Sequence, residues 1–142
     1  EDDGRSLPLD TCFVLREGTD VTVVTWGAAS MDCIAAADAL AEQGVSVEVI
    51  DVATLSLLDT ETILASVEKT GRCVIVHEAA RTGGFGAEIA ACVAEEALAS
   101  LIAPIERVAG YDTVMPLPRL EAHYLPGADR IASAVRAAME HR

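Results

Sequence analysis

Four short runs of apolar, mostly β-branched residues recur along the chain at similar intervals. They lie at residues 21–26, 45–51, 72–78 and 105–109. Segments with helical spacing of apolar residues separate them, and this alternation is typical of βαβ crossovers and therefore of parallel strands. The runs VTVVTW and CVIVHE are almost continuously apolar, which predicts strands that are covered on both faces and lie at the centre of the sheet.

The intervening segments carry helix start and stop signals. We expect helices from Ser30 to Gln43, from Asp59 to Lys69, from Gly86 to Ala99, and from Gly127 to the end of the chain. Ser30 and Asp59 are the expected N-caps, and Gly44 and Gly71 can close the first two helices in a left-handed conformation. The first helix bears Met31, Ile34 and Leu40, and the third is expected to bury Ile89, Val93 and Leu98.

A fifth β-prone run, at residues 11–15, precedes the first parallel strand. The turn 17–20 is too short for a crossover helix, so we expect an antiparallel hairpin between this run and 21–26. The predicted fold class is α/β: a three-layer α/β/α domain with a five-stranded mixed sheet, four strands parallel and one antiparallel. The proline-punctuated segment 110–126 has no strand or helix pattern, but it is apolar enough that it should pack on its own domain or dock on a neighbour.

The length of 142 residues fits one domain. Polar residues at the start predict a linker remnant at 1–8, followed by one domain at 9–142 that continues from a missing upstream partner domain. No apolar run approaches the roughly 18 residues that a membrane span needs, and there is no signal-peptide pattern. We therefore expect a soluble protein that is not exported, in the cytoplasm of a bacterium or in the mitochondrial matrix of a eukaryote.

The charge balance restricts the partners. Ten basic against 23 acidic residues give a net charge of −13, which repels nucleic acid and anionic membranes and favours a basic protein surface. The four cysteines, Cys12, Cys33, Cys73 and Cys92, are tens of residues apart. Without a CxxC pair they predict reduced, mostly buried thiols rather than a metal or redox centre.

Candidate chemistry gathers where the parallel strands end, the edge at which open α/β sheets bind ligands. The residues expected there are Trp26, Gly27, Asp51, His77, Glu78, Arg81, Tyr111 and Asp112. One histidine beside one glutamate is a common strand end, so we interpret His77 as a hydrogen-bonded structural or interface residue. The alternative is a hydrolase that uses His77 and Glu78.

The segment 82–86, TGGFG, joins a central strand to a helix, as phosphate-binding loops do. It matches a dinucleotide fingerprint poorly, because the third glycine is missing and Glu88 occupies the first helical turn. One hypothesis is that the glycines allow close packing against another chain, with Phe85 as an exposed apolar anchor. The alternative is a stand-alone nucleotide or anion regulator that uses Gly83, Gly84 and Gly86.

Several sequence blocks resemble one family. GTDVTVVTWG at 18–27, VEVIDVATLSLLD at 47–59, SVEKTGRCVIVHEAARTGGFGAEIAA at 66–91 and API-RV-GYDT from 103 to 113 resemble the C-terminal domain of the β subunit of the thiamine-diphosphate-dependent component of 2-oxo acid dehydrogenase complexes. This is the transketolase C-terminal fold, and the resemblance extends from about residue 7 to residue 139. The pyruvate and branched-chain enzymes share these blocks, and GYDT slightly favours the branched-chain type.

The resemblance implies an enzyme that is an α2β2 heterotetramer, which decarboxylates a 2-oxo acid on thiamine diphosphate with Mg and transfers the acyl group to lipoamide. The upstream domain of the β subunit supplies the cofactor-activating glutamate and the catalytic histidine, so this chain is expected to be inactive alone, with no catalytic, cofactor-binding or metal residues. Its implied partners are a second β subunit, the α subunit and the basic subunit-binding domain of the dihydrolipoyl acyltransferase. The expected subunit interface comprises His77, Gly83, Gly84, Phe85, Gly86 and Glu88.

Three positions depart from the family pattern. An acidic residue usually precedes the Ala-Pro pair and is thought to meet an arginine of the docking partner, whereas this chain has Ile102. Ile102 and Arg142 are nevertheless the candidate docking residues. Where the family pattern DLRTLSPLD has arginine and proline, this chain has Ala53 and Leu57, which suggests an atypical paralogue.

Overall fold

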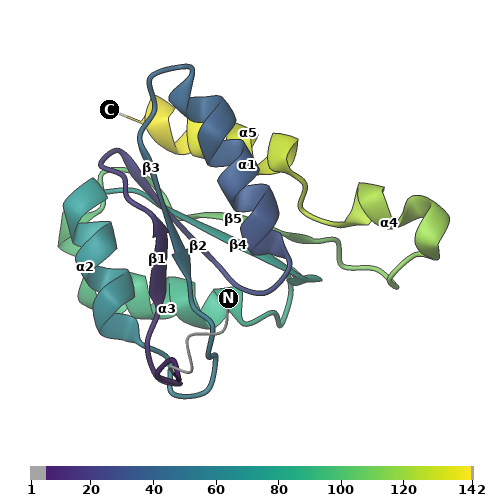
Figure 1. The fold of residues 1–142 in the computed structure, drawn as a ribbon, viewed down its shortest axis with the longest axis horizontal. Helices are drawn as coiled ribbons and strands as arrows, with labels where there is room; N and C mark the ends of the chain where they lie inside the picture. Colours follow the sequence, from purple (N-terminus) through teal and green to yellow (C-terminus); the bar gives the residue numbers. More distant parts are fainter. Residues whose placement is uncertain (1–5, 142) are drawn as a thin grey trace.

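The computed structural model describes residues 6–141, so Arg142 lies outside the described residues. Figure 1 shows the helices and strands in their order along the chain. The strands are β1 (Phe13–Arg16), β2 (Val21–Thr25), β3 (Val47–Asp51), β4 (Cys73–Ala80) and β5 (Glu106–Gly110). The helices are α1 (Ala29–Ala41), α2 (Thr60–Thr70), α3 (Gly86–Glu96), α4 (Pro118–Tyr124) and α5 (Ala128–Glu140), with a short 3-10 turn at Leu98–Ser100.

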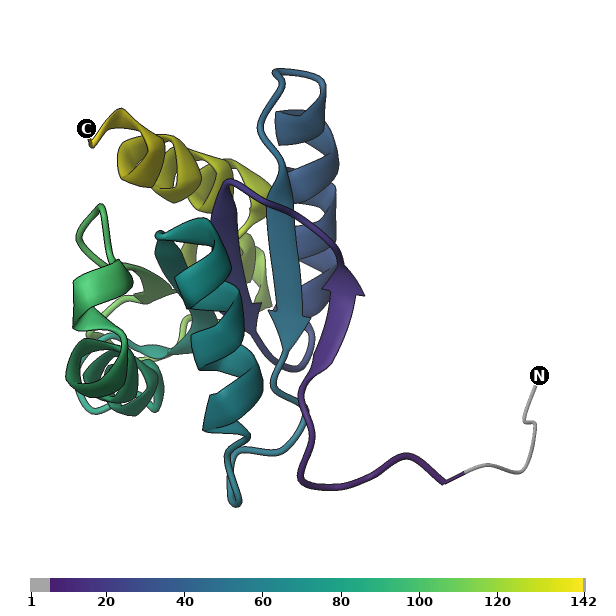
Figure 2. The same cartoon turned by 90° about the vertical axis from the view of Figure 1, so that its left-hand side faces the viewer.

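The strands form one five-stranded sheet in the order β1-β3-β2-β4-β5. Strands β2 to β5 run parallel, and β1 runs antiparallel along β3 at one edge (Figure 2). Helices α1 and α5 cover one face, and α2 and α3 cover the other (Figure 1). The predicted three-layer architecture with one reversed strand is confirmed.

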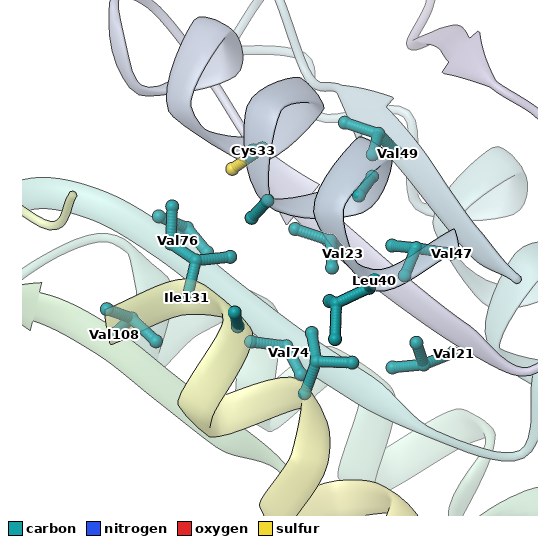
Figure 3. Packing of buried hydrophobic residues seen from close by; sticks show 14 of the residues in the cluster. Val21, Val23, Cys33, Leu40, Val47, Val49, Val74, Val76, Val108 and Ile131 are labelled. Carbon is teal, nitrogen blue, oxygen red and sulfur yellow. The ribbon is translucent and has the colours of Figure 1, made fainter. Parts of the chain in front are cut away.

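The core lies on both faces of the sheet because neighbouring residues of a strand point to opposite sides. Val23 packs beneath α1 and α5, whereas Val24, the next residue, packs toward α2 and α3. Figure 3 shows the first of these layers, in which strand valines meet Leu40 of α1 and Ile131 of α5. Both faces of β2 are buried, as its continuous apolar sequence predicts.

The expected hairpin between β1 and β2 is wrong, because β3 lies between them. The connection at 17–20 crosses the beginning of β3, a sideways step of roughly 10 Å that four extended residues can span. Gly18 makes the crossing possible, since a Cβ there would lie 2.2 Å from the backbone of Val47 and Glu48. The amides of Thr19 and Asp20 both donate to the Ser46 carbonyl, at 3.2 and 2.9 Å.

A buried polar network fastens this crossing to α2. Glu48 of β3 accepts from the Gly18 amide at 3.2 Å, from the Ser66 hydroxyl and from the Lys69 ammonium group. Burial alone would raise the pKa of Glu48, but the hydrogen bonds from Lys69, Ser66 and Gly18 outweigh it and lower that pKa. The carboxylate is therefore charged, paired and structural.

Helix boundaries follow the predicted signals in part. Asp59 caps α2 by accepting from the Thr62 amide at 3.0 Å, and Gly71 closes the helix at a φ of 70°. Ser30 is not the cap of α1: the helix begins after Ala28, and the Ser30 hydroxyl donates to the Gly27 carbonyl. Ile89 and Val93 are buried as expected, but Leu98 is exposed, because α3 ends at Glu96 instead of continuing to residue 99.

The segment 110–126 contains a helix that the sequence pattern did not predict, α4, with Pro118 at its start. Residues 112–123 extend away from the body of the domain (Figure 1), and we call them the arm. Tyr111 and Tyr124, at its two ends, meet edge to face with ring centres 6.2 Å apart. The arm is therefore closed at its base, while Val114 and Leu117 are 86% and 83% exposed.

Candidate functional site

The carboxyl end of β4 places His77 inside the protein rather than at a surface. Its side chain is 1% exposed. The Trp26 indole stacks on the imidazole with a centroid distance of 5.3 Å and an interplanar angle of 12°, and Phe85 meets the indole edge on at 6.0 Å. The residue that follows β2, strand β4 and the loop at residues 82–86, which we call the glycine loop, thus contribute to one aromatic cluster.

The chemistry of His77 follows from this burial. Among the described residues, neither ring nitrogen has a regular hydrogen-bond partner. Desolvation lowers the pKa of His77, with the charge of Arg107 acting in the same direction and the Ala79 backbone opposing it. The imidazole is therefore neutral near pH 7 and inaccessible to a substrate. The expectation of a structural histidine is supported, although the expected hydrogen bonds are missing.

The hydrolase alternative requires His77 and Glu78 to act together. They are consecutive residues of β4, and the pairing of β4 with β5 shifts register between His77 and Ala80. His77 is buried and Glu78 is exposed. The structure therefore does not bring this pair together as an acid–base site.

The glycine loop covers His77. A Cβ on Gly84 would lie 2.7 Å from the imidazole Cε1, and a Cβ on Gly86 would lie 2.5 Å from both Cδ2 and Nε2. Gly83 adopts a φ of 73°, a conformation that favours glycine. Two of the three glycines are thus required by contacts inside the chain. The expected close packing of this loop against another chain stays a prediction.

The same loop offers little to a nucleotide. The amides of Ala87 and Glu88 already donate to the carbonyls of Gly84 and Phe85, at 3.0 and 2.9 Å. Glu88 adds negative charge in the first turn of α3, where a phosphate would have to dock. The geometry therefore disfavours the nucleotide or anion regulator that Gly83, Gly84 and Gly86 suggested.

Hydrogen bonds also tie the loop to the start of the arm. The Asp112 carboxylate accepts from the Thr82 amide at 2.8 Å and from the Thr82 hydroxyl at 2.6 Å. These bonds, followed by a smaller contribution from Arg81, lower the pKa of Asp112. The Arg81 amide donates to the Gly110 carbonyl at 3.1 Å. Loop and arm therefore form one continuous surface at the carboxyl edge of the sheet.

A groove of about 610 Å³ runs along the outer side of the loop. Four of the six expected interface residues line it: Gly83, Gly84, Phe85 and Glu88. The other lining residues are Leu55, Leu58, Thr60, Ala87 and Cys92. Gly86 and His77 lie beneath this surface, and Phe85 is half-buried against the core rather than the exposed anchor that we expected.

The segment between β3 and α2 borders this groove. It carries two of the three departures from the family pattern, Ala53 and Leu57. Ala53 and Leu57 have φ angles of 55° and 69°. Proline cannot adopt such an angle, so the backbone at Leu57 is incompatible with the family's proline. Leu57 is also 76% exposed, which makes it part of the accessible apolar surface beside the groove.

The candidate docking residue Ile102 lies elsewhere. Its amide donates to the Gly71 carbonyl at 2.9 Å, so it sits near the beginning of β4, at the opposite end of the sheet from the glycine loop. Its side chain is 56% exposed. Ile102 is therefore not part of the surface formed by the loop, the groove and the arm.

The part of the chain that the structure describes contains neither a cluster of metal ligands nor a membrane-spanning helix. No group of three or more His, Cys, Asp or Glu side chains between residues 6 and 141 could hold a metal ion. None of the helices in that range combines the length and apolarity of a bilayer-spanning helix. All four cysteines are free, and burial raises the pKa of the Cys12, Cys33 and Cys73 thiols to about 12, which suits structural thiols.

Comparison with known proteins agrees with this architecture. Residues 10–131 match the family described as "Transketolase, C-terminal domain". The chain is 48% identical over 134 residues to the 2-oxoisovalerate dehydrogenase subunit beta of Pseudomonas aeruginosa, covering 94% of this chain and 37% of that protein. It is 46% identical over 129 residues to the pyruvate dehydrogenase E1 component subunit beta of Leifsonia xyli, covering 91% and 38%.

A solved structure titled "Split gene transketolase, inactive beta4 tetramer" superposes with a TM-score of 0.83 at 29% identity. The superposition covers 95% of this chain and 43% of that chain. The chain thus spans about two fifths of the length of the relatives that it matches. With the matching sequence, strand order and helix layers together, this chain belongs to the transketolase C-terminal domain family.

Proposed function

We propose that this chain is the assembly domain of the β subunit of a 2-oxo acid dehydrogenase. The parent enzyme would catalyse oxidative decarboxylation of pyruvate or a branched-chain 2-oxo acid and transfer the acyl group to lipoamide. The names of the relatives support this choice of enzyme. The observation that carries the assembly role is the exposed apolar surface beside the groove and along the arm, where Leu57, Val114 and Leu117 are largely exposed.

The primary partner at this surface would be a second copy of the β subunit, and the α subunit would also contact the domain. The subunit-binding domain of the dihydrolipoyl acyltransferase would dock separately, around Ile102 and Arg142. The net charge of −13 supports a basic docking partner and opposes nucleic acid and membranes. The proposed location is the bacterial cytoplasm, or the mitochondrial matrix in a eukaryote.

Thiamine diphosphate and Mg²⁺ would be bound by another part of the parent enzyme. The glycine loop is a poor fit for the diphosphate, because the amides of Ala87 and Glu88 are already bonded and Glu88 adds negative charge. The catalytic residues would likewise belong to that other part of the enzyme.

Self-association tests the proposal directly. Phe85→Asp is a poor probe, because Phe85 also packs on Trp26 and the core. Leu57→Asp and Leu117→Asp change side chains that are 76% and 83% exposed, so the fold should tolerate them. We expect sedimentation velocity to show a self-associating chain whose association is weakened by either substitution.

Leu98→Asp is the matched control. Leu98 is 65% exposed but follows the far end of α3, away from the glycine loop. Its substitution should leave self-association unchanged. A wild-type chain that is monomeric at every concentration measured, or equal weakening by all three variants, would overturn the proposed interface.

A further inference from the structure

Three arginines gather along β5, at the open edge of the sheet. Arg107 belongs to β5 itself, Arg81 follows β4, and Arg130 lies in the first turn of α5. Two adjoining hollows, of about 240 and 360 Å³, lie beside this edge, and both are lined by Arg107 and Arg130. Arg81 also lines the smaller hollow. We call the two hollows together the arginine pocket.

Backbone carbonyls hold two of these guanidinium groups in place. Arg81 donates to the Arg107 carbonyl at 2.7 Å, and Arg130 donates to the Ala109 carbonyl at 2.7 Å. Arg130 also bonds the carbonyls of Tyr124 and Leu125 and lies 4.7 Å from the centre of the Tyr111 ring. These neutral partners orient the two cations without neutralising their charge.

Arg107 is the unused donor of the group. Within residues 6–141, its guanidinium makes no recorded hydrogen bond and no ion pair, although the side chain is only partly exposed. The carboxylates that line the pocket are Asp112 and Asp129, and Asp112 is already bonded to Thr82. Three positive and two negative side chains leave a local positive excess in a chain whose net charge is −13.

We propose that the arginine pocket binds a small oxyanion, a phosphate or a carboxylate group, with Arg107 as its principal donor. A guanidinium offers two parallel N–H groups, a geometry that matches both kinds of oxyanion. Arg81 and Arg130 line the same pocket as Arg107 and add to the positive potential. The site adjoins the arm at Asp112, and it needs no catalytic step.

NMR titration of the chain separates the sources of the oxyanion. Inorganic phosphate and succinate are titrated in two separate experiments, with sodium chloride holding the ionic strength constant. We expect saturable shifts of the side-chain Nε–H signals of Arg81, Arg107 and Arg130 with at least one of the two anions. The anion whose titration saturates identifies the ligand class, and equal shifts with chloride alone would overturn the proposal.

Arg107→Gln should weaken the binding by roughly tenfold or more, because it removes a charge-assisted donor. The fold should persist, since no ion pair of the Arg107 guanidinium is found within residues 6–141 and the Arg107 carbonyl, which accepts from Arg81, is kept. Arg107→Lys, which keeps the charge but loses the planar fork, should weaken binding less. Arg136→Gln, on the same helix as Arg130, is the control and should leave binding unchanged. Unchanged affinity in Arg107→Gln would overturn the assignment.

Discussion

Gly86 lies directly against the imidazole of His77, so closely that a Cβ on Gly86 would stand 2.5 Å from Nε2. The contact joins the first residue of α3 to the end of β4 and closes the space above the Trp26–His77 stack. The glycine loop is therefore shaped by the buried ring beneath it. Its outer side is left to form the groove.

Gly86→Ala should destabilise the fold by about 1–3 kcal/mol, because the methyl group would be forced into a packed ring. Urea denaturation would measure the change. Gly127→Ala is a suitable control, since nothing lies within 4 Å of a Cβ at that position and the backbone φ is −76°. If both variants lose the same stability, the loss at Gly86 does not arise from contact with His77.

His77 should make the stability depend on pH. Its pKa in the folded chain is below the ordinary 6.5, so between these two values the unfolded chain binds more protons than the folded one. The free energy of unfolding should therefore fall as the pH drops below about 6.5, and this loss should level off below the folded pKa.

His77→Gln removes this titration, so its stability should change less between about pH 7.5 and about pH 5.5 than that of the wild type. Denaturant unfolding at the two pH values measures the difference. Exposed His123 serves as a control, because His123→Gln should retain the wild-type dependence. Identical dependence in all three proteins would contradict the role of His77.

Glu48→Gln should cost about 1–3 kcal/mol of stability, since it weakens a buried, charge-assisted network that holds the β1–β2 crossing to α2. The pKa of Glu48 is held below 4.5, so its contribution is present above that pH and is lost as the pH falls through the folded pKa. Thermal unfolding near neutral pH tests the substitution. Glu68→Gln, at an exposed position of α2, should have little effect.

Asp112→Ala should loosen the glycine loop without unfolding the domain, because Asp112 holds Thr82 from outside the core. Hydrogen exchange at the Thr82 amide should become faster. The amides of buried β2 serve as an internal reference and should exchange as in the wild type. Unchanged exchange at Thr82 would show that the loop does not depend on this carboxylate.

Leu57→Gly should stabilise the chain by up to about 1 kcal/mol, because it relieves a left-handed backbone and removes little packing. Leu57→Pro should instead destabilise it, since the proline ring excludes a φ of 69°. Chemical denaturation of both variants tests the backbone conformation. Stabilisation by the proline would mean that the segment adopts the family's conformation in solution.

Some features could be predicted because neighbouring residues determine them. The carboxylate of Asp59 is three residues from the Thr62 amide that it caps, and Gly71 ends α2 through its own backbone angle. The helix α4 was missed because its seven residues show no apolar stripe and lie among prolines. Within the candidate site, the glycine loop could be recognised from its sequence. The burial of the His77 ring beneath this loop could not.

The fold class follows from the amino-acid sequence, because strand and helix periodicities are local and each apolar run must be covered. The family follows from the blocks of specific residues. The tertiary structure decided the place of β3 between β1 and β2, the burial of His77 under Gly84 and Gly86, and the meeting of Arg81, Arg107 and Arg130. These relationships join residues that are distant in the chain. They depend on how whole strands and helices pack, which no local pattern encodes.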